Sequence, residues 1–361
     1  MKIVTVVGAR PQFIKAATVS RQVRERDGVE DVIIHTGQHY DAQMSDVFFE
    51  SMDIPKPNYN LEIGGGTHGA MTGQQLERIE AVLMDEKPDW VLVYGDTNST
   101  LAGALAAAKL HIPVAHVESG LRSFNRRMPE EINRVLTDHV ATLLFVPSQL
   151  AVDNLALEGI TGDQVVNVGD VMYDASLIYA ETADTRSQII EELGLEPGKF
   201  RLCTCHRQEN VDDPRRLAAI FSALRELSND MPLVLPLHPR TRKMLEATGN
   251  FDAMVAGLTI TEPVGFFDIF RLMRDACMVL TDSGGLQKEA YFHGTPVVVL
   301  RDETEWKELV DMGWAKLADP ESSQEILSAC VSLTVPDHAG SVSPYGNGDA
   351  AQKILDRLLA G

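Results

Sequence analysis

One segment of the chain, Asp282 to Glu289, places a serine (Ser283) and two glycines (Gly284 and Gly285) between a predicted strand and a predicted helix. Two glycines let the backbone turn tightly, and the N–H groups at the helix start form an anion site together with the helix dipole and the serine hydroxyl. Such a site suits a diphosphate, and Glu289, about one turn into the helix, suits a ribose diol better than a phosphate. The alternative is an ordinary strand–helix turn that Ser283 caps.

Two cations follow the first predicted strand. Arg10 precedes Pro11 at the start of a predicted helix, and Lys15 lies one turn inside that helix. Because the dipole disfavours positive charge at a helix N-terminus, two cations there indicate an anionic partner. A pair of solvent-exposed charges is the alternative.

Three carboxylates and a histidine are candidates for acid–base chemistry. Asp96 and Glu118 follow strands that we expect to be neighbours, and Glu130 opens a predicted helix. His206 ends the first predicted strand of the second half. Carboxylates in a cleft can be pushed apart in pKa, so that one acts as acid and another as base. The alternatives are a helix cap for Asp96 and favourable N-terminal helix charge for Glu130; for the adjacent Glu131 we prefer the helix charge.

Metal and dinucleotide patterns are weak in this chain. His116-Val117-Glu118 superficially resembles a deaminase metal motif, but no P-C-x-x-C accompanies it, so we interpret His116 as a core residue. The four cysteines show no C-x-x-C spacing, and we expect no metal and no cofactor. Gly64-x-Gly66-x-x-Gly69 matches the dinucleotide fingerprint, but it follows a weak strand and is not the first strand–helix turn. We therefore do not expect a nicotinamide site.

The elements that must position these residues alternate as strand and helix along nearly the whole chain. This order predicts two doubly wound α/β domains with parallel strands, whose ligands sit at the carboxyl ends of the strands in a cleft between the domains. We expect a first domain over residues 1–172, a second over 173–345, and a C-terminal helix over 346–361 that packs back on the first. The predicted strands are Ile3–Val7, Val32–Thr36, Trp90–Tyr94, Val114–Val117, Leu143–Val146, Val165–Val168, Leu202–Cys205, Leu233–Leu237, Leu258–Thr261, Met278–Thr281 and Val297–Leu300.

Composition excludes several classes of function. The 361 residues contain 32 Lys+Arg against 52 Asp+Glu, a formal net charge of −20. Such an acidic surface repels nucleic-acid phosphates and anionic membranes, so we expect neither as a partner. No apolar run approaches the roughly 20 residues needed to span a bilayer, and the N-terminus lacks a signal-peptide pattern, so we expect a soluble, cytoplasmic protein.

Taken in order along the chain, these motifs resemble the non-hydrolysing UDP-N-acetylglucosamine 2-epimerases, which have the two-domain glycosyltransferase-B architecture. The resemblance runs almost end to end. Its motifs are Gly8-Ala9-Arg10-Pro11 with Lys15, Gly37-Gln38-His39, Gly95-Asp96-Thr97, His116 to Arg122, Pro129 to Arg134, His206 to Asn210, His238-Pro239, Thr281 to Glu289 and Pro344 to Gly348.

The resemblance implies reversible inversion at C2 of a UDP-2-acetamido sugar, UDP-GlcNAc to UDP-ManNAc, by elimination of UDP to a 2-acetamidoglucal and re-addition. It implies no cofactor and a homodimer. Asp96, Glu118, Glu130 and His206 match catalytic residues of the family. The positions that match its substrate-binding residues are Arg10, Lys15, His238, Ser283, Gly284, Gly285 and Glu289.

Three departures from the family pattern bear on the sugar. Ala9 and Gln12 stand in a motif that more commonly reads Gly-Thr-Arg-Pro-Glu, and Trp306 stands where the family has a substrate-binding arginine. The chain has Gly64 to Gly69 where substrate-activated bacterial enzymes have an arginine, so we do not expect that activation. These changes resemble the branch that acts on UDP-2,3-diacetamido-2,3-dideoxyglucuronate, which is the alternative substrate.

Two other classes of function compete with this prediction. A retaining glycosyltransferase of the same fold would use the same diphosphate turn but would need an acceptor pocket, and it rarely needs three carboxylates. A nucleotide-sugar-binding regulator would need neither the carboxylates nor His206. Fold alone does not separate these classes, so the decision depends on the site.

Overall fold

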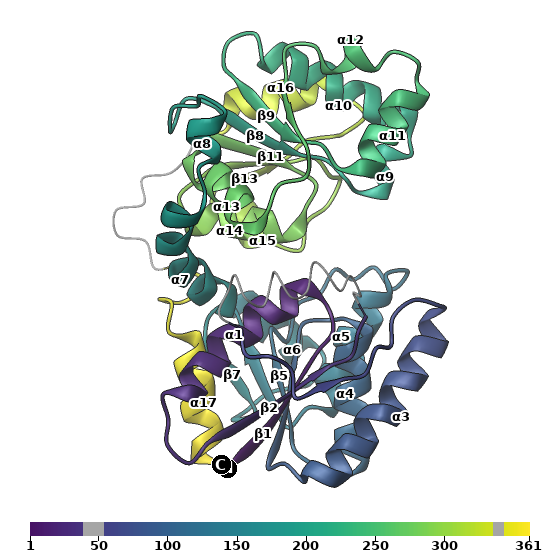
Figure 1. The fold of residues 1–361 in the computed structure, drawn as a ribbon, viewed down its shortest axis with the longest axis vertical. Coiled ribbons are helices and arrows are strands. Elements are labelled where there is room, and N and C mark those ends of the chain that lie inside the picture. The colour runs from purple at the N-terminus through teal and green to yellow at the C-terminus, as the bar shows by residue number, and fades with distance from the viewer. Residues whose placement is uncertain (39–53, 335–342) are drawn as a thin grey trace. The chain divides into compact units, whose positions relative to one another are not determined.

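The computed structural model describes residues 1–38, 54–334 and 343–361 (Figure 1). The chain divides into an N-terminal unit, Met1–Leu177 with Val342–Gly361, and a C-terminal unit, Ile178–Ser341. It leaves the first unit within helix α7 (Val171–Arg186). Each unit is an α/β layer structure built on its own sheet.

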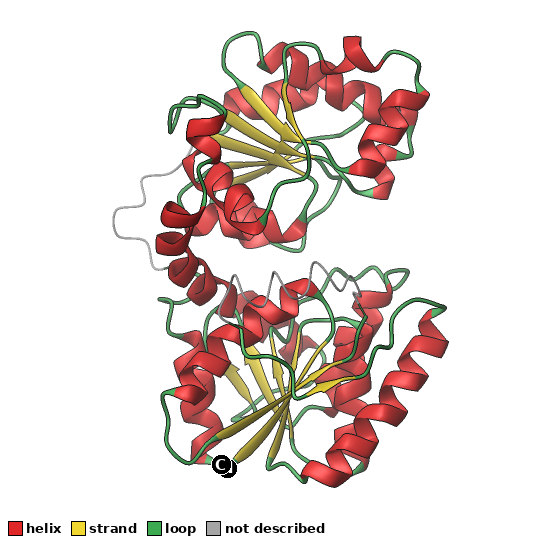
Figure 2. Cartoon of the chain, in the orientation of Figure 1, coloured by secondary structure: helices red, strands yellow, loops and turns green. Residues whose placement is uncertain are grey.

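The N-terminal unit contains a seven-stranded parallel sheet in the order β3-β2-β1-β4-β5-β6-β7. Helices cover both of its faces (Figure 2), which explains why strand β4 is apolar throughout and fully buried. The strands are β1 (Lys2–Val7), β2 (Glu30–His35), β3 (Tyr59–Asn60), β4 (Trp90–Tyr94), β5 (Val114–Val117), β6 (Leu143–Val146) and β7 (Val165–Asn167).

The C-terminal unit contains a six-stranded parallel sheet in the order β10-β9-β8-β11-β12-β13. Its strands are β8 (Arg201–Thr204), β9 (Leu233–Pro236), β10 (Thr259–Thr261), β11 (Met278–Thr281), β12 (Val297–Val299) and β13 (Ala315–Leu317). Strand β13 is absent from the sequence-based prediction because three residues with a central lysine carry no strand pattern.

Helices flank the strands of both units. Those of the N-terminal unit are α1 (Arg10–Arg24), α3 (His68–Glu86), α4 (Asn98–Lys109), α5 (Pro129–Val140), α6 (Gln149–Leu157) and α17 (Ala350–Ala360). Those of the C-terminal unit are α8 (Ile189–Glu192), α9 (Gln208–Val211), α10 (Pro214–Leu227), α11 (Pro239–Ala247), α12 (Phe251–Val255), α13 (Phe266–Asp275), α14 (Gly284–Phe292), α15 (Lys307–Asp311) and α16 (Ser323–Ser332).

Both sheets reverse their strand order at one point. The first strand of each lies between the second and the fourth, so the reversal falls between β1 and β4 in one unit and between β8 and β11 in the other. Ligands of doubly wound sheets bind beyond the carboxyl ends of the strands at such a point. The predicted α/β class is therefore confirmed, and the candidate residues after these strands lie at the expected edges.

The glycine pattern Gly64 to Gly69 lies elsewhere. It follows β3 at the edge of its sheet, away from the point of reversal. A Cβ added at Gly65, Gly66 or Gly69 would meet no atom within 4 Å, so no close backbone approach requires these glycines. The position agrees with the sequence-based argument against a dinucleotide site.

The C-terminal helix α17 packs beside α1, although the two are far apart in sequence (Figure 1). Arg26 and Asp356 form an ion pair of 2.7 Å at this junction. Asp174 accepts hydrogen bonds from the backbone N–H groups of Ala350 and Ala351, at 3.2 and 2.7 Å. Burial raises the pKa of Asp174 to about 6, against the effect of these hydrogen bonds. The contacts tie the end of the chain to the N-terminal unit.

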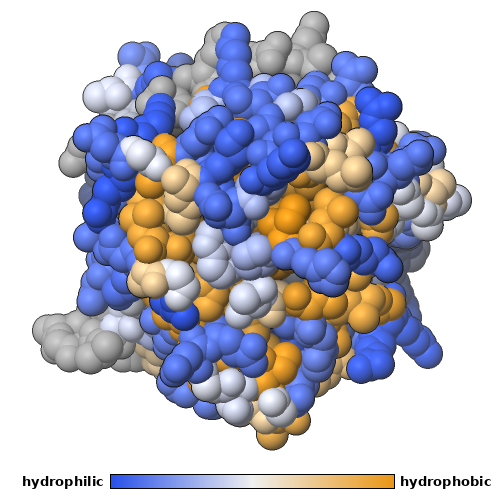
Figure 3. Space-filling model, turned by 90° about the horizontal axis from the view of Figure 1, so that it is seen from below, coloured by the Kyte–Doolittle hydropathy of each residue, from blue (hydrophilic) through white to orange (hydrophobic). Residues whose placement is uncertain are grey.

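Some apolar side chains reach the surface. Figure 3 shows one face of the molecule, on which hydrophobic areas are interrupted by hydrophilic ones. Ile132 and Leu136, four residues apart on α5, are each 46% exposed. Within the described ranges, no helix is long and apolar enough to cross a membrane.

Candidate active site

Asp96 follows β4 in a turn whose backbone is held tightly. Gly95 has a φ of +62°, a left-handed conformation that glycine adopts without strain. Thr97, not Asp96, caps helix α4, because its hydroxyl accepts from the backbone N–H of Thr100. The cap interpretation of Asp96 is therefore wrong, and its carboxylate serves another purpose.

Helix α5 supplies the partners of Asp96. The Arg134 guanidinium pairs with the Asp96 carboxylate, and the Asn133 side-chain amide donates to the Asp96 carbonyl at 2.9 Å. Glu131 holds the other end of Arg134 at 2.8 Å. The same Glu131 carboxylate accepts from the backbone of Ser123 at 2.9 Å and so anchors the preceding loop.

Glu131 is thus a buried anchor, not only the N-terminal helix charge that the sequence suggests. Arg134 is a further candidate residue that is not singled out from the sequence. The i, i+3 spacing of Glu131 and Arg134 within a recognised motif is the signal that could have identified the pair.

Glu118 follows β5 and pairs with Lys15. Its φ of +67° is unusual for a residue with a side chain, and such strain is concentrated at functional sites. Lys15 is 8% exposed, so the interpretation of Lys15 as a solvent-exposed charge is wrong. A Cβ built on Gly95 would lie 3.5 Å from both the Lys15 Nζ and a Glu118 carboxylate oxygen. The pair therefore lies directly beside the turn that carries Asp96.

Arg10 and Glu130 differ from these buried groups. Arg10 is exposed in the first turn of α1, and Glu130 is exposed in the first turn of α5. Both lie on the side of the sheet where the strands end. Of the residues predicted for this unit, the structure thus brings Lys15, Glu118 and the Asp96 turn into one partly buried cluster and leaves two at the surface.

Gln12 connects the turn after β1 with the turn after β4. Its side-chain oxygen accepts from the backbone of Gly8 and Ala9 at 2.8 and 3.0 Å, and its amide nitrogen donates to the Tyr94 carbonyl at 2.7 Å. An amide offers both a donor and an acceptor, which an ionised carboxylate does not. Gln12, which departs from the more common family motif, therefore links the turn after β1 to the turn after β4.

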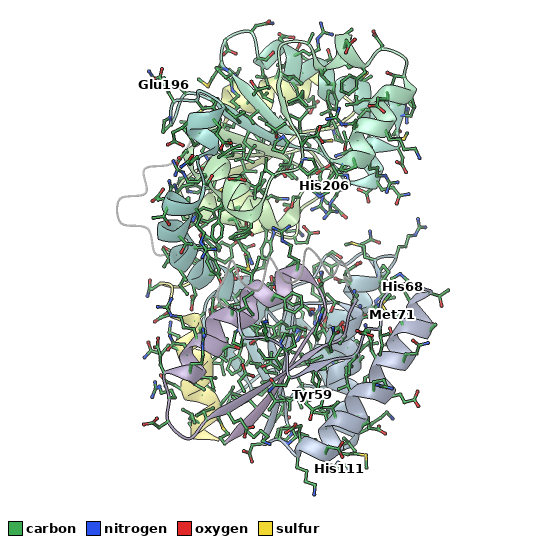
Figure 4. All side chains as sticks on the ribbon, viewed as in Figure 1. Tyr59, His68, Met71, His111, Glu196 and His206 are labelled. Atoms are coloured by element: carbon green, nitrogen blue, oxygen red, sulfur yellow. The ribbon has the colours of Figure 1, made fainter. Side chains whose placement is uncertain are left out.

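In the C-terminal unit, a buried aspartate shapes the turn after β8. The Asp282 carboxylate accepts from the backbone N–H groups of His206 at 3.0 Å and Arg207 at 2.9 Å. Asn210 donates to it at 3.2 Å. The His206 side chain is 43% exposed at the edge of this unit (Figure 4), with its Nδ1 3.6 Å from Asp282. His206 therefore has a fixed backbone and an accessible ring.

His238 lies next to His206, with 5.8 Å between the ring centroids. It caps helix α11, since its Nδ1 accepts from the backbone N–H of Arg240 at 3.2 Å. Burial lowers the pKa of His238, and the charges of His206 and Arg240 lower it further. A neutral ring is what this accepting role requires.

The turn after β11 begins helix α14. Ser283 occupies the N-cap position, but its hydroxyl makes no capping hydrogen bond. The chain itself has room for a side chain here, since a Cβ at Gly284 would meet Glu305 at 3.6 Å and Arg207 at 3.9 Å. Neither Gly284 nor Gly285 has a positive φ. Because the two glycines carry no side chain, neither covers the N-terminus of α14, where an anion site would lie.

Trp306 contacts this turn through Gly284 and Lys288. It is 6% exposed, its indole N–H donates to the Gly284 carbonyl at 2.9 Å, and its ring centroid lies 4.1 Å from the Lys288 Nζ. Glu289 lies partly buried in the second turn of the same helix. Trp306, which stands in place of a family arginine, carries no charge that could bind an anion. It stabilises the turn instead, through its hydrogen bond to Gly284.

No metal site emerges within residues 1–38, 54–334 and 343–361, where no three potential ligand side chains gather. The cysteines Cys203, Cys205 and Cys330 are buried and Cys277 is partly buried, and all four are free thiols. Burial raises the pKa of Cys203 and Cys205 well above the usual range. His39, part of one predicted motif, lies outside the described residues.

Comparison with known proteins gives these residues a context. The family model for UDP-N-acetylglucosamine 2-epimerase matches residues 21–359. A UDP-2,3-diacetamido-2,3-dideoxy-D-glucuronate 2-epimerase of Pseudomonas aeruginosa is 51% identical, over 99% of both chains. A UDP-N-acetylglucosamine 2-epimerase of Methanocaldococcus jannaschii is 41% identical, over the full length of both.

Solved structures agree. The Methanocaldococcus jannaschii enzyme in complex with UDP-GlcNAc and UDP matches with a TM-score of 0.87, and 100% of both chains is covered. The enzyme of Neisseria meningitidis bound to UDP-GlcNAc matches with a TM-score of 0.88 at 31% identity, again over 100% of both chains. The motifs at the strand ends, the two sheets and these matches lead to one conclusion: the chain belongs to the UDP-N-acetylglucosamine 2-epimerase family.

Proposed function

We propose that the protein catalyses reversible inversion at C2 of a UDP-linked 2-acetamido sugar. The observation that carries this proposal is the pair of carboxylates, Asp96 and Glu118, each held by a cation at the ends of neighbouring parallel strands. Two placed carboxylates are the groups that removal and return of a proton require. The full-length match to 2-epimerases supports the same reaction.

The proposed reaction has two halves. A carboxylate of the N-terminal unit takes the proton from C2 while the bond between C1 and the UDP oxygen breaks, leaving a 2-acetamidoglucal and UDP. A proton is then delivered to the opposite face of C2, and UDP adds back to C1. Asp96, Glu118, Glu130 and His206 are the groups we assign to these proton transfers.

The C-terminal unit is assigned the binding of UDP. Negative charge grows on the diphosphate as it leaves C1, so donors placed in advance lower the barrier. The open N–H groups at the start of α14 and the Ser283 hydroxyl supply such donors, and Glu289 suits the ribose. Arg10, Lys15 and His238 complete the proposed substrate-binding set, although in this structure Lys15 pairs with Glu118.

For the sugar, we propose UDP-2,3-diacetamido-2,3-dideoxyglucuronate in preference to UDP-GlcNAc. A relative named for this uronate is 51% identical, whereas a relative named as a UDP-N-acetylglucosamine 2-epimerase homolog is 49% identical and one named as a UDP-N-acetylglucosamine 2-epimerase is 41% identical. Buried Trp306, in place of a family arginine, also fits a change of substrate.

The decisive experiment follows C2 inversion by proton NMR in D2O, with each UDP sugar in a separate incubation. Conversion of one nucleotide sugar without an acceptor, with deuterium entering C2 of the product, is the expected result. Faster turnover of the uronate supports the proposed substrate, and faster turnover of UDP-GlcNAc overturns that part. Dependence on an acceptor would favour a retaining glycosyltransferase.

We also propose a cytoplasmic homodimer. Ile132 and Leu136 lie on one side of α5 and expose apolar surface, which supports association between copies. Light scattering after gel filtration tests this, with Ile132→Lys plus Leu136→Lys expected to give a monomer. A monomeric wild-type chain would refute the dimer.

A further inference from the structure

His116, interpreted from sequence as a core residue, contacts two oxygens in the interior of the N-terminal unit. It lies on β5 and its side chain is fully buried. Its Nδ1 is 2.7 Å from a carboxylate oxygen of Asp138, and its Nε2 is 2.7 Å from the Gly95 carbonyl oxygen. Both distances are those of short, strong hydrogen bonds.

Neither of these oxygens can donate a proton to the ring. A backbone carbonyl only accepts. The Asp138 carboxylate also accepts from the Gly120 N–H at 3.1 Å and pairs with Arg122 at 2.7 Å. Burial favours the neutral carboxyl, but the His116 and Arg122 contacts outweigh burial and hold the pKa of Asp138 below its usual range. Both contacts therefore call for His116 as the donor, one from each ring nitrogen.

His116 joins the two turns that carry the candidate carboxylates. Its Nε2–H holds the carbonyl of Gly95, the residue before Asp96, while the Gly95 N–H donates to Val117 at 3.0 Å. Its Nδ1–H holds Asp138, which in turn binds the backbone of Gly120, two residues after Glu118.

We propose that His116 is a positioning residue that donates from both ring nitrogens and holds the Asp96 turn and the Glu118 turn at a set separation through Asp138. The proposal rests on the proposed epimerase function, since that function assigns proton transfer to both carboxylates. It concerns placement of the carboxylates and not contact of His116 with substrate.

The charges around the His116–Asp138 pair come from several elements. Arg122, in the loop after β5, contacts Asp138 directly, and Glu158 at the end of α6 contacts Arg122. Lys15 on α1 and Glu118 after β5 lie beside Gly95, whose carbonyl contacts His116, and Asp96 follows Gly95.

The first test is nitrogen NMR of the whole protein labelled with ¹⁵N-histidine. The His116 signals are identified by their loss in His116→Gln. Because each contact calls for the ring to donate, we expect both ring nitrogens to show the protonated signature. A ring with one unprotonated nitrogen would overturn the proposal, whether or not the protein is an epimerase.

The second test uses Asp138→Asn, which removes the carboxylate but keeps its shape. The new side-chain amide can donate to Nδ1 of a neutral ring, so the geometry survives at high pH and is lost when the ring gains its second proton. In this variant we expect kcat to fall on acidification in step with the NMR titration of His116. A ring titration that leaves kcat unchanged would show a merely structural role.

If Asp138→Asn does not fold, His116→Gln provides a separate test. Glutamine cannot donate in two opposite directions, so we expect kcat to fall about tenfold to hundredfold with UDP affinity unchanged. Exposed His111, labelled in Figure 4, provides the matched control His111→Asn, which should leave kcat unchanged. An unchanged kcat in His116→Gln refutes the proposal. Absence of epimerase activity in the wild type instead refutes the proposed function and leaves the NMR test standing.

Discussion

The two units each contain a buried aspartate that shapes a turn, but the groups that bind this aspartate differ. Each has a buried aspartate that accepts backbone hydrogen bonds and so shapes a turn: Asp138 binds Gly120, and Asp282 binds His206 and Arg207. Asp138 is also bound by two side chains, His116 and Arg122, at 2.7 Å each. Asp282 is held by backbone N–H groups and by the neutral amide of Asn210.

This difference extends to the rest of each site. In the N-terminal unit Lys15 pairs with Glu118 and Arg134 pairs with Asp96. In the C-terminal unit the Ser283 hydroxyl makes no cap, and Gly284 leaves space before the helix start. Proton transfer needs carboxylates in set positions, whereas binding of an anion needs donors that the chain does not use itself. The net charge of −20 therefore does not oppose a nucleotide ligand, because the donors are local.

The strongest test of this division is loss of the carboxylates alone. Asp96→Asn and Glu118→Gln should each lower kcat by about a thousandfold, since each removes a proposed proton-transfer group. UDP affinity, measured by calorimetry, should stay within about twofold because the proposed binding turn is intact. Exposed Asp163→Asn is the control. Near-normal turnover would remove that carboxylate from the proposed mechanism.

A smaller effect is expected from Arg134→Lys. The guanidinium reaches Glu131 and Asp96 with two different nitrogens, which a single ammonium cannot do. We expect kcat to fall about tenfold to hundredfold with little change in KM. Exposed Arg127→Lys should have no effect. A rise in KM alone would mean that Arg134 acts on substrate binding instead of on Asp96.

Glycine substitutions compare the two units directly. Gly284→Ala should weaken UDP binding about tenfold without loss of stability, because its Cβ would meet neighbours only at ordinary contact distances, 3.6 Å and beyond. Gly120→Ala should instead lower the melting temperature, because φ is +77° and the Cβ would lie 2.6 Å from the Ala151 carbonyl. Calorimetry with UDP and thermal unfolding measure both. Destabilisation by Gly284→Ala without loss of UDP affinity would contradict the anion site.

The smallest predicted effect concerns pH and a buried histidine of the N-terminal unit. Burial lowers the pKa of His35 to about 4. An unfolded histidine binds a proton below about pH 6.5, so between these values the unfolded state holds more protons and stability falls as pH falls.

His35→Phe keeps the edge contact with Phe13 and removes the titration. From about pH 6.5 to 4.5 the wild type should lose about 1 to 2 kcal/mol more than the variant, measured by urea unfolding. Asp174 acts in the opposite direction in both proteins, because its pKa is raised to about 6. Equal losses in wild type and variant would show that His35 does not titrate in this way.

Much of the fold and of the candidate site can be predicted from the sequence. Strand β4 is predicted residue for residue, because five consecutive apolar residues indicate a strand buried on both faces. Asp96 and Glu118 are found because a polar residue directly after such a strand lies where doubly wound sheets bind ligands. The exposure of Glu130 and the cap made by His238 are not readable, since both depend on how neighbouring elements pack.

The sequence by itself determined the alternation of elements, the family and the strand ends at which chemistry can occur, because these depend on local patterns of apolar and polar residues. Only the tertiary structure decided which charges meet. Lys15 reaches Glu118, Arg134 reaches Asp96, and His116 lies between Asp138 and Gly95. These partners are distant along the chain and come together only when parallel strands align, so the spacing of residues in the sequence does not reveal them. Burial of Lys15 and Arg134 then makes a partner necessary, because an unpaired charge in the interior is too costly to keep.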